Sequence, residues 1–234
     1  MSIPDSVRHE WLRRVEAEYR SSAISQELTL WLTRIGASPD LIHEGLRIAD
    51  DEIVHAELSF AAYVAAGGSE GPRLERETLG IGAPIDQHPL EVHVLRTVVD
   101  VFCLGETVAV PLFRELRQHA TVPEARTLLD RVLVDEVRHR DFGWLALGWM
   151  LVQPDSATYL TIVNAELPAF FARIKRAYGG ITSDYEVSEV ERAWGLMSPK
   201  RYGEILHRTF ERDYEPRFQK LGIDANAAWA QASI

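Results

Sequence analysis

The chain has 234 residues, of which 46% are hydrophobic, so it is long enough to bury one sizeable core and its composition gives no sign of disorder. Its formal net charge of −10 argues against nucleic acid or an anionic membrane surface as a partner, because both attract basic proteins. The single cysteine, Cys103, excludes an internal disulfide, a zinc ribbon and a rubredoxin-type iron centre, which all need more thiols.

Two helices are predicted in the first third of the chain. Over about 5–35, apolar residues recur at three- and four-residue steps until a glycine ends the pattern. Ser38 and Pro39 then mark the N-cap and the first residue of a second helix, over about 39–66. Residues 67–89 are rich in Gly and Pro and lack periodicity, so they are predicted to form a long connection. A loop of this length is uncommon in a compact domain unless it crosses the fold.

A second helical pair is predicted over about 90–119 and 123–152, with a tight break between the two helices. Further helices follow toward the C-terminus, over about 156–178, 186–197 and 199–221. Strand signals are nearly absent, so the expected fold is all-α. We expect a single domain over 1–234, with a four-helix core at about 5–152 and accessory helices at about 155–222.

The first residues lack the apolar run and the cleavage site of a signal peptide. In addition, no stretch approaches 18 uncharged apolar residues, the length at which a membrane-spanning helix would be considered. We therefore expect a cytoplasmic protein that makes no membrane contact.

The motif Asp-Glu-x-x-His occurs twice, once with Glu52 and His55 and once with Glu136 and His139. Residues three apart lie on one face of a helix, so each motif offers an oxygen and a nitrogen ligand to one point in space. With 22 Glu and 8 His in the chain, roughly 0.75 accidental Glu-x-x-His matches are expected, and three are present. The third, at 204–207, lacks the preceding Asp, and we interpret it as a coincidental surface feature. A solvated helix face is the alternative for either motif alone.

Each repeated motif follows a helix that carries a candidate carboxylate ligand. Glu106 lies about as far before the turn near residue 121 as Glu136 lies after it, so antiparallel helices would place the two side by side. In the first half, the position that mirrors Glu52 is near residue 24, where the chain has no carboxylate. Glu27 comes three residues later on an apolar stripe, whereas Glu18 comes six residues earlier on a face that looks solvated. We assign Glu27 as the ligand and keep Glu18 as the alternative.

Four carboxylates and two imidazoles suit iron first and manganese second, since no thiolate is offered. Burying four glutamates without a cation would cost several kcal/mol each, or force their protonation. The predicted cofactor is therefore two iron ions, with an Mn/Fe pair as an alternative. Asp51 and Asp135 precede the histidines by four residues. We expect them to accept the second ring N–H of a metal-bound histidine on the neighbouring helix and so to orient it.

The two motifs, their glutamate-bearing partner helices and the hairpin layout resemble the ferritin-like di-iron carboxylate proteins over about residues 10–150. The resemblance implies a ferritin-like four-helix bundle whose metal ligands are Glu27, Glu52, His55, Glu106, Glu136 and His139. In length, motif spacing and long helical tail, the layout is most similar to that of aldehyde-deformylating oxygenase-type members. Ser59 departs from ribonucleotide reductase small subunits, which have a radical tyrosine there, and Val132 departs from arylamine N-oxygenases, which have a further histidine.

Small residues near the presumed metals would leave an apolar substrate pocket, with ordinary helix packing as the alternative. The candidate lining residues are Ala49, Ser59, Phe102, Cys103, Val110 and Gly143. Pro111 removes the helical hydrogen bond to the Thr107 carbonyl, so we also expect a kink or a loosened turn just after Glu106.

These observations predict a non-haem di-iron oxidoreductase, an oxygenase such as a monooxygenase or an oxidase, that uses O2 to oxidise a small, largely apolar organic substrate. Because the sequence has no flavin, nicotinamide or Fe–S motif, electrons would come from a separate reductase. A homodimer is left open. The alternatives are a ferroxidase or iron-handling protein without an organic substrate, and a metal-free helical interaction module.

Overall fold

The structure is a computed structural model, and it describes residues 2–75, 77, 79–80, 87–179 and 185–232. Within these ranges the chain is all-α, with no β-strand. The helices, in chain order, are α1 (Asp5–Arg34), α2 (Pro39–Ala65), α3 (Leu90–Thr97), η2 (Val98–Glu106), α4 (Thr107–His119), α5 (Pro123–Met150), α6 (Ser156–Ile174), η3 (Lys175–Gly179), α7 (Glu189–Ala193), α8 (Pro199–Thr209), η4 (Phe210–Tyr214), α9 (Glu215–Lys220) and α10 (Ala225–Gln231). Part of the predicted crossover, namely residues 76, 78 and 81–86, lies outside the described residues.

The first two helices begin and end at the residues that the sequence predicts, to within one residue. After α1, Gly36 takes a φ of +74°, a left-handed conformation that glycine adopts without the steric penalty of a Cβ. Ser38 is the N-cap of α2, and Pro39, which has no N–H to leave unsatisfied, is its first residue. Local chemistry alone therefore fixes this turn.

The third predicted helix is instead three segments, because the nine residues of η2 form a π-helix between α3 and α4. A π-helix closes its hydrogen bonds between residues five apart and so has a wider turn than an α-helix. Pro111 lies inside α4, where it cannot donate to the Thr107 carbonyl. The irregular backbone therefore lies mainly before Glu106, on the N-terminal side of the position that the proline predicts.

The C-terminal helices match the predictions less closely. The range predicted as 186–197 contains only α7, which begins with a reciprocal cap between Ser188 and Glu191. The range predicted as 199–221 is divided into α8, η4 and α9, and η4 is again a π-helix. α10 lies beyond the predicted helices, because seven residues are too few to show a 3.6-residue period.

The chain divides into two compact units. Unit 1 comprises Met1–Leu90, Phe113–Asp135 and Val187–Met197, and unit 2 comprises Glu91–Leu112, Glu136–Glu186 and Ser198–Ile234. Helices α4 and α5 contribute residues to both. The single domain of the sequence analysis stays a prediction.

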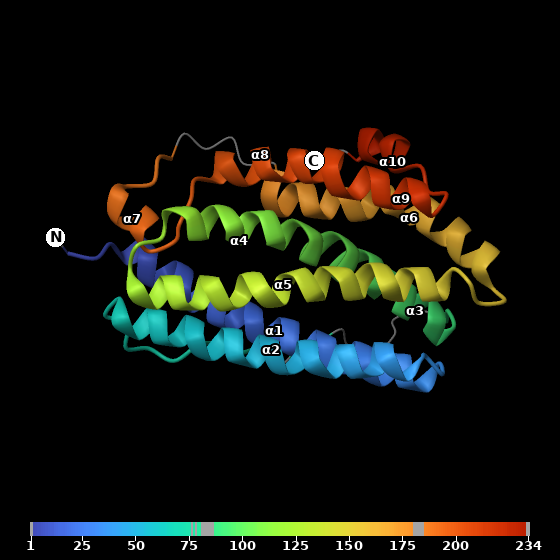
Figure 1. The fold of residues 1–234 in the computed structure, drawn as a ribbon, viewed down its shortest axis with the longest axis horizontal. Helices are drawn as coiled ribbons and strands as arrows, with labels where there is room; N and C mark the ends of the chain where they lie inside the picture. Colours follow the sequence, from blue (N-terminus) through green and yellow to red (C-terminus); the bar gives the residue numbers. More distant parts are fainter. Residues whose placement is uncertain (1, 76, 78, 81–86, 180–184, 233–234) are drawn as a thin grey trace. The chain divides into compact units, whose positions relative to one another are not determined.

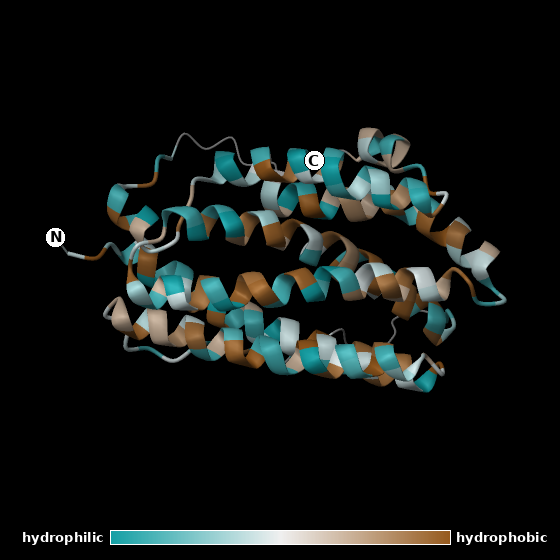
Figure 2. Ribbon diagram, viewed as in Figure 1, coloured by the Kyte–Doolittle hydropathy of each residue, from teal (hydrophilic) through white to brown (hydrophobic). Residues whose placement is uncertain are grey.

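Unit 1 is built on the hairpin of α1 and α2, which lie side by side along their length (Figure 1). Hydrophobic and hydrophilic residues are interspersed along both helices, as expected for helices with one buried face (Figure 2). Trp11, Ala62 and Leu129 are each fully buried in the core of this unit. The backbone N–H groups of Thr121 and Val122 both donate to the Ala193 carbonyl, at 2.9 and 3.1 Å, and so bind the turn before α5 to α7.

Unit 2 has an aromatic core around Phe171, whose ring meets those of Phe210, Phe218 and Trp229 edge to face at 5.1–6.1 Å. The fully buried Tyr214 donates its hydroxyl hydrogen to the Leu104 carbonyl at 2.6 Å, which connects η4 to η2. Among the described helices, none combines the length and the apolar character that crossing a lipid bilayer requires.

Candidate metal-binding site

Two serines of α1 fix its register against α2. Ser22 Oγ donates to the Ala49 carbonyl at 2.8 Å, and Ser21 Oγ donates to Glu52 Oε1 at 2.9 Å. Since Ser21 and Glu52 face each other, the hairpin is centred between residues 36 and 37. In an antiparallel pair with this centre, the residue of α1 opposite His55 is Glu18.

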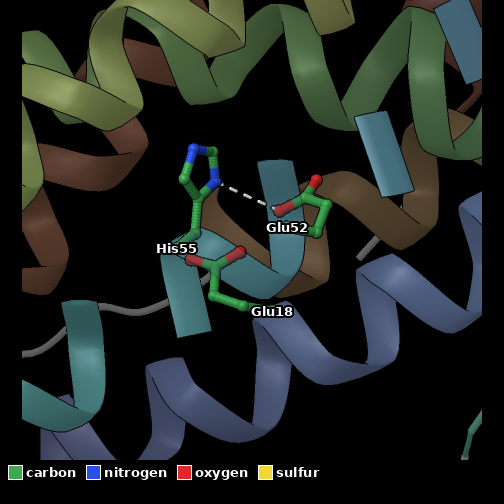
Figure 3. Close-up of side chains that lie close together, drawn as sticks. All are labelled: Glu18, Glu52 and His55. Atoms are coloured by element: carbon green, nitrogen blue, oxygen red, sulfur yellow. Dashed lines mark hydrogen bonds and ion pairs between the residues drawn. The ribbon is translucent and has the colours of Figure 1, made fainter. Parts of the chain in front are cut away.

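Glu18, Glu52 and His55 come together in unit 1, with one possible ligand atom from each lying within 4.8 Å of the others (Figure 3). His55 is 0% exposed and Glu52 is 1% exposed, whereas Glu18 is partly exposed. Figure 3 shows the Glu18 carboxylate, from α1, beside the two side chains of α2. Two carboxylates and an imidazole at this spacing are the ligands that a divalent first-row transition metal accepts.

The structure brings Glu18, and not the assigned Glu27, to the motif of α2. The predicted mirror position of Glu52, near residue 24, corresponds to a turn centred near residue 38. The observed centre moves that position by three residues, almost a full helical turn, to Ser21. Glu27 lies elsewhere: its Oε2 is only 2.8 Å from where a Cβ on Gly80 would stand. The face that looked solvated is therefore the one that carries a carboxylate toward His55.

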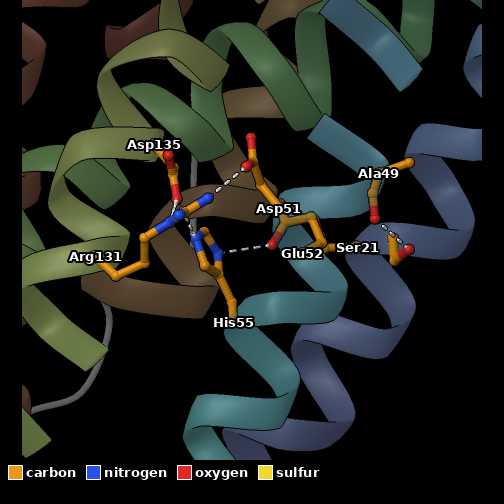
Figure 4. A network of polar contacts seen from close by, with 8 residues as sticks. Ser21, Ala49, Asp51, Glu52, His55, Arg131 and Asp135 are labelled. Atoms are coloured by element: carbon orange, nitrogen blue, oxygen red, sulfur yellow. Dashed lines mark hydrogen bonds and ion pairs between the residues drawn. The ribbon is translucent and has the colours of Figure 1, made fainter. Parts of the chain in front are cut away.

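Both ring nitrogens of His55 face carboxylates. Nδ1 lies 3.2 Å from Glu52 Oε2, and Nε2 lies 3.1 Å from Oδ2 of Asp135, a buried residue of α5 (Figure 4). A deprotonated carboxylate can only accept a hydrogen bond, and a neutral imidazole has one N–H to give. With that N–H at Nε2, directed to Asp135, the lone pair of Nδ1 points toward another acceptor. The Nδ1 lone pair and the Glu52 oxygen would then both be acceptors, and a cation between them, either a metal ion or a second proton, would bridge the two atoms.

Arg131 joins the two motif aspartates in unit 1. Its Nη2 donates to Asp51 Oδ1 at 3.0 Å and its Nε donates to Asp135 (Figure 4). The hydrogen bond and the charge of Asp135, followed by those of Asp51, raise the pKa of the Arg131 guanidinium. Both aspartates are at least 96% buried, so the arginine compensates part of the cost of burying them. Asp135, held by Arg131, is thereby positioned to orient His55.

Arg131 was not among the residues predicted for the site. Its one signal was the spacing of four residues before Asp135, which places the two on one helix face. Such pairs are common on solvated helices, and nearly half of the Arg131 side chain is indeed exposed. The spacing therefore did not distinguish it from an ordinary surface arginine.

The second motif lies in unit 2 together with Glu106. Glu106, Glu136 and His139 are all buried, with exposed fractions of 8%, 3% and 0%. A carboxylate oxygen of Glu106 and a ring nitrogen of His139 lie within 4.8 Å of each other. Glu106 is the last residue of η2, and the next residue, Thr107, accepts a hydrogen bond from Trp144 Nε1 at 2.9 Å. The predicted ligands of this half are thus buried, with Glu106 at the end of a π-helix and Glu136 and His139 on the regular helix α5.

The predicted pocket residues are all buried and closely packed. Ala49 and Ser59 are in unit 1, whereas the other four are in unit 2, where Phe102, Cys103 and Val110 are at most 4% exposed. A Cβ added to Gly143 would stand 2.6 Å from the Phe102 backbone, so this glycine permits close helix packing instead of leaving space. Burial raises the pKa of the Cys103 thiol well above its ordinary value, so it stays protonated and is a poor metal ligand.

The third Glu-x-x-His differs from the other two. Glu204 and His207 are both exposed on α8, and Glu204 accepts a hydrogen bond from Arg201 Nη1 at 2.7 Å. The His207 ring meets Trp229 edge to face at 5.7 Å. These contacts are those of a surface feature.

No known protein family, curated protein or solved structure matches this chain.

Proposed function

We propose that the protein is a non-haem di-iron oxidoreductase that uses O2 to oxidise a small, largely apolar organic substrate. The observation that carries the proposal is His55, whose Nε2 faces Asp135 while Nδ1 faces Glu52 with Glu18 nearby. In a metal-binding histidine the two ring nitrogens have different partners. One nitrogen binds the metal, and the other donates a hydrogen bond to a carboxylate that fixes the orientation of the ring. The all-carboxylate and imidazole donor set fits iron.

The proposed first group of ligands is Glu18, Glu52 and His55, and Asp135 and Arg131 orient the histidine. Ser21 holds Glu52 through one carboxylate oxygen and leaves the other beside His55 Nδ1. The proposed second group is Glu106, Glu136 and His139, which rests on the sequence repeat and on the burial of all three. Iron bound by these residues would supply the electrons and the open coordination positions that O2 reduction requires.

In this proposal the protein's own groups keep the oxidation away from water and hold the ligands in place. His55 and His139 are inaccessible to solvent, and the aromatic rings of Phe102 and Phe142 pack edge to face at 5.1 Å in unit 2. An apolar substrate suits such surroundings better than a charged one. The electron donor is proposed to be a separate reductase.

A ferroxidase or iron-handling protein is the second candidate. The observation that favours it is the partial exposure of Glu18, because a ligand near solvent gives iron a way in and out. An oxygenase keeps its metal through turnover, whereas an iron-handling protein releases it as ferric iron.

Anaerobic titration of the metal-free protein with Fe(II) tests the proposal. We expect saturation at two Fe per chain, and on O2 exposure a Mössbauer spectrum of exchange-coupled ferric ions that stay bound to protein. Candidate aldehydes, amines and fatty acyl compounds are then supplied with a chemical reductant, and oxidised products are measured. Release of ferric iron over repeated additions, with no organic product, would select the iron-handling function. Failure to bind any iron would eliminate both.

A further inference from the structure

Unit 2 contains a cavity of about 480 Å³ between α5 and the η4–α9 segment. This volume lies within the range of small-molecule binding sites, roughly 300–1,000 Å³. None of the predicted metal ligands or substrate-pocket residues lines it. The cavity is therefore separate from the site proposed above.

Its charged lining is mainly basic. Arg212, Arg217 and Lys220 contribute three positive charges against one carboxylate, that of Asp213. Arg212 and Lys220 are exposed, and Arg217 lies 3.9 Å from the carboxylates of both Asp213 and Asp141, with its guanidinium carbon 5.4 Å from the centre of the Trp144 ring. A local excess of positive charge is unexpected on a chain whose net charge is −10. Such a group attracts anions over about a Debye length.

The rest of the lining is apolar and consists of Trp144, Pro216 and Leu221. The Trp144 ring is fixed from two sides, because its Nε1 donates to Thr107 and its edge meets the Phe218 ring at 4.9 Å. A preorganised aromatic wall costs little entropy when a flat group packs against it. The cavity thus offers cationic side chains and an apolar surface together.

We propose that this cavity binds a small organic anion, with a carboxylate or phosphate group held by the three basic side chains and a flat apolar body packed against Trp144. Arginine suits either anionic group because its guanidinium matches two oxygens at once. Because its apolar body contacts Trp144, such a ligand should bind more tightly than a simple inorganic ion. The site requires no iron, so it is independent of the proposed oxidation chemistry.

Isothermal titration calorimetry on the full-length, metal-free protein tests this with benzoate and phenyl phosphate as probes. Benzamide is the uncharged match of benzoate, and acetate and inorganic phosphate lack the ring. We expect one site per chain for at least one aromatic anion, with at least tenfold weaker binding of benzamide and of the ringless anion. Comparing benzoate with phenyl phosphate distinguishes a carboxylate ligand from a phosphate ligand. Binding should also weaken as salt is raised.

Substitution of the exposed cations locates the site. Arg212→Gln with Lys220→Gln should weaken binding of the aromatic anion at least tenfold, whereas Lys200→Gln with Arg208→Gln, which removes two exposed charges from α8, should leave it unchanged. All four side chains are partly or fully exposed, so folding should survive and circular dichroism checks it. Absence of binding, equal binding of benzamide, or equal loss in both double variants would overturn the proposal.

Discussion

The two Asp-Glu-x-x-His motifs follow helices of different kinds. Glu18 stands on a regular α-helix whose register against α2 is set by Ser21 and Ser22, whereas Glu106 ends a nine-residue π-helix. On a regular hairpin, the position of a ligand depends on the centre of the turn. On a π-helix, the position of a ligand depends on the number of residues per turn. Hydrogen bonds between residues five apart widen the turn, and this changes which residues share a face of the helix. One repeated motif is therefore paired with carboxylates on two different kinds of helix.

Loss of His55, the histidine of the first motif, should lower Fe(II) affinity the most. His55→Ala removes the nitrogen ligand of unit 1 and leaves Glu52 and Asp135 buried without it. We expect Fe(II) affinity at this group to fall by more than about 100-fold, beyond the usual effect of losing an orienting residue. Anaerobic titration measures it, with His207→Ala of the surface motif as the control. Equal affinity in wild type and His55→Ala would remove this group from the metal site.

Loss of the bridging arginine should have the next largest effect. Arg131→Gln leaves Asp51 and Asp135 without their shared cation, so His55 loses its fixed orientation. We expect Fe(II) affinity to fall about 10- to 100-fold, the usual consequence of losing an orienting partner. Arg117→Gln breaks an arginine–aspartate pair with the exposed Asp130 and should leave Fe(II) affinity unchanged. If Arg131→Lys recovers part of the Fe(II) affinity and both variants keep normal thermal stability, Arg131 acts by orienting His55 and not by stabilising the fold.

Two glutamates of α1 test the register directly. Glu18→Gln should weaken Fe(II) binding roughly tenfold, because an amide oxygen is a poorer donor than a carboxylate. Glu27→Gln should leave binding unchanged, since Glu27 lies against Gly80. If Glu27→Gln weakened Fe(II) binding and Glu18→Gln did not, Glu27 would be the ligand from α1, as the sequence predicts.

The smallest effect concerns the π-helical half. Tyr214→Phe removes the hydrogen bond to the Leu104 carbonyl and leaves a buried acceptor behind. We expect the free energy of unfolding in urea to fall by about 1–3 kcal/mol. Ser21→Ala, on a less buried hydrogen bond of the regular half, should cost less. Unchanged stability in Tyr214→Phe would show that η2 does not depend on this contact.

Much of the fold could be predicted from the sequence, because local signals decide it. Pro39 and Gly36 set the α1–α2 turn, and apolar residues recur at three- and four-residue steps along α1. The π-helices could not be predicted, since the test for periodicity assumes 3.6 residues per turn. The same assumption extends one helix over 90–119, where the structure has three segments.

The candidate ligands that share one helix follow from the sequence, whereas the carboxylate on α1 depends on how α1 packs against α2. Glu52 and His55 follow from spacing alone, as do Glu136 and His139. Glu18 depends on the exact centre of the hairpin, because a shifted centre moved the mirror position of Glu52 by three residues and favoured Glu27. The basic cavity near Trp144 could not be foreseen, because its lining joins segments that the chain separates by more than 60 residues.

The most direct test is a crystal structure of the iron-loaded protein, with data collected at the iron absorption edge. We predict an anomalous peak from an iron ion bound by His55 Nδ1, Glu52 and Glu18, with Nε2 of His55 still facing Asp135. An iron bound by Nε2, or an iron peak with Glu27 in place of Glu18, would contradict it. So would a structure in which iron occupies neither motif.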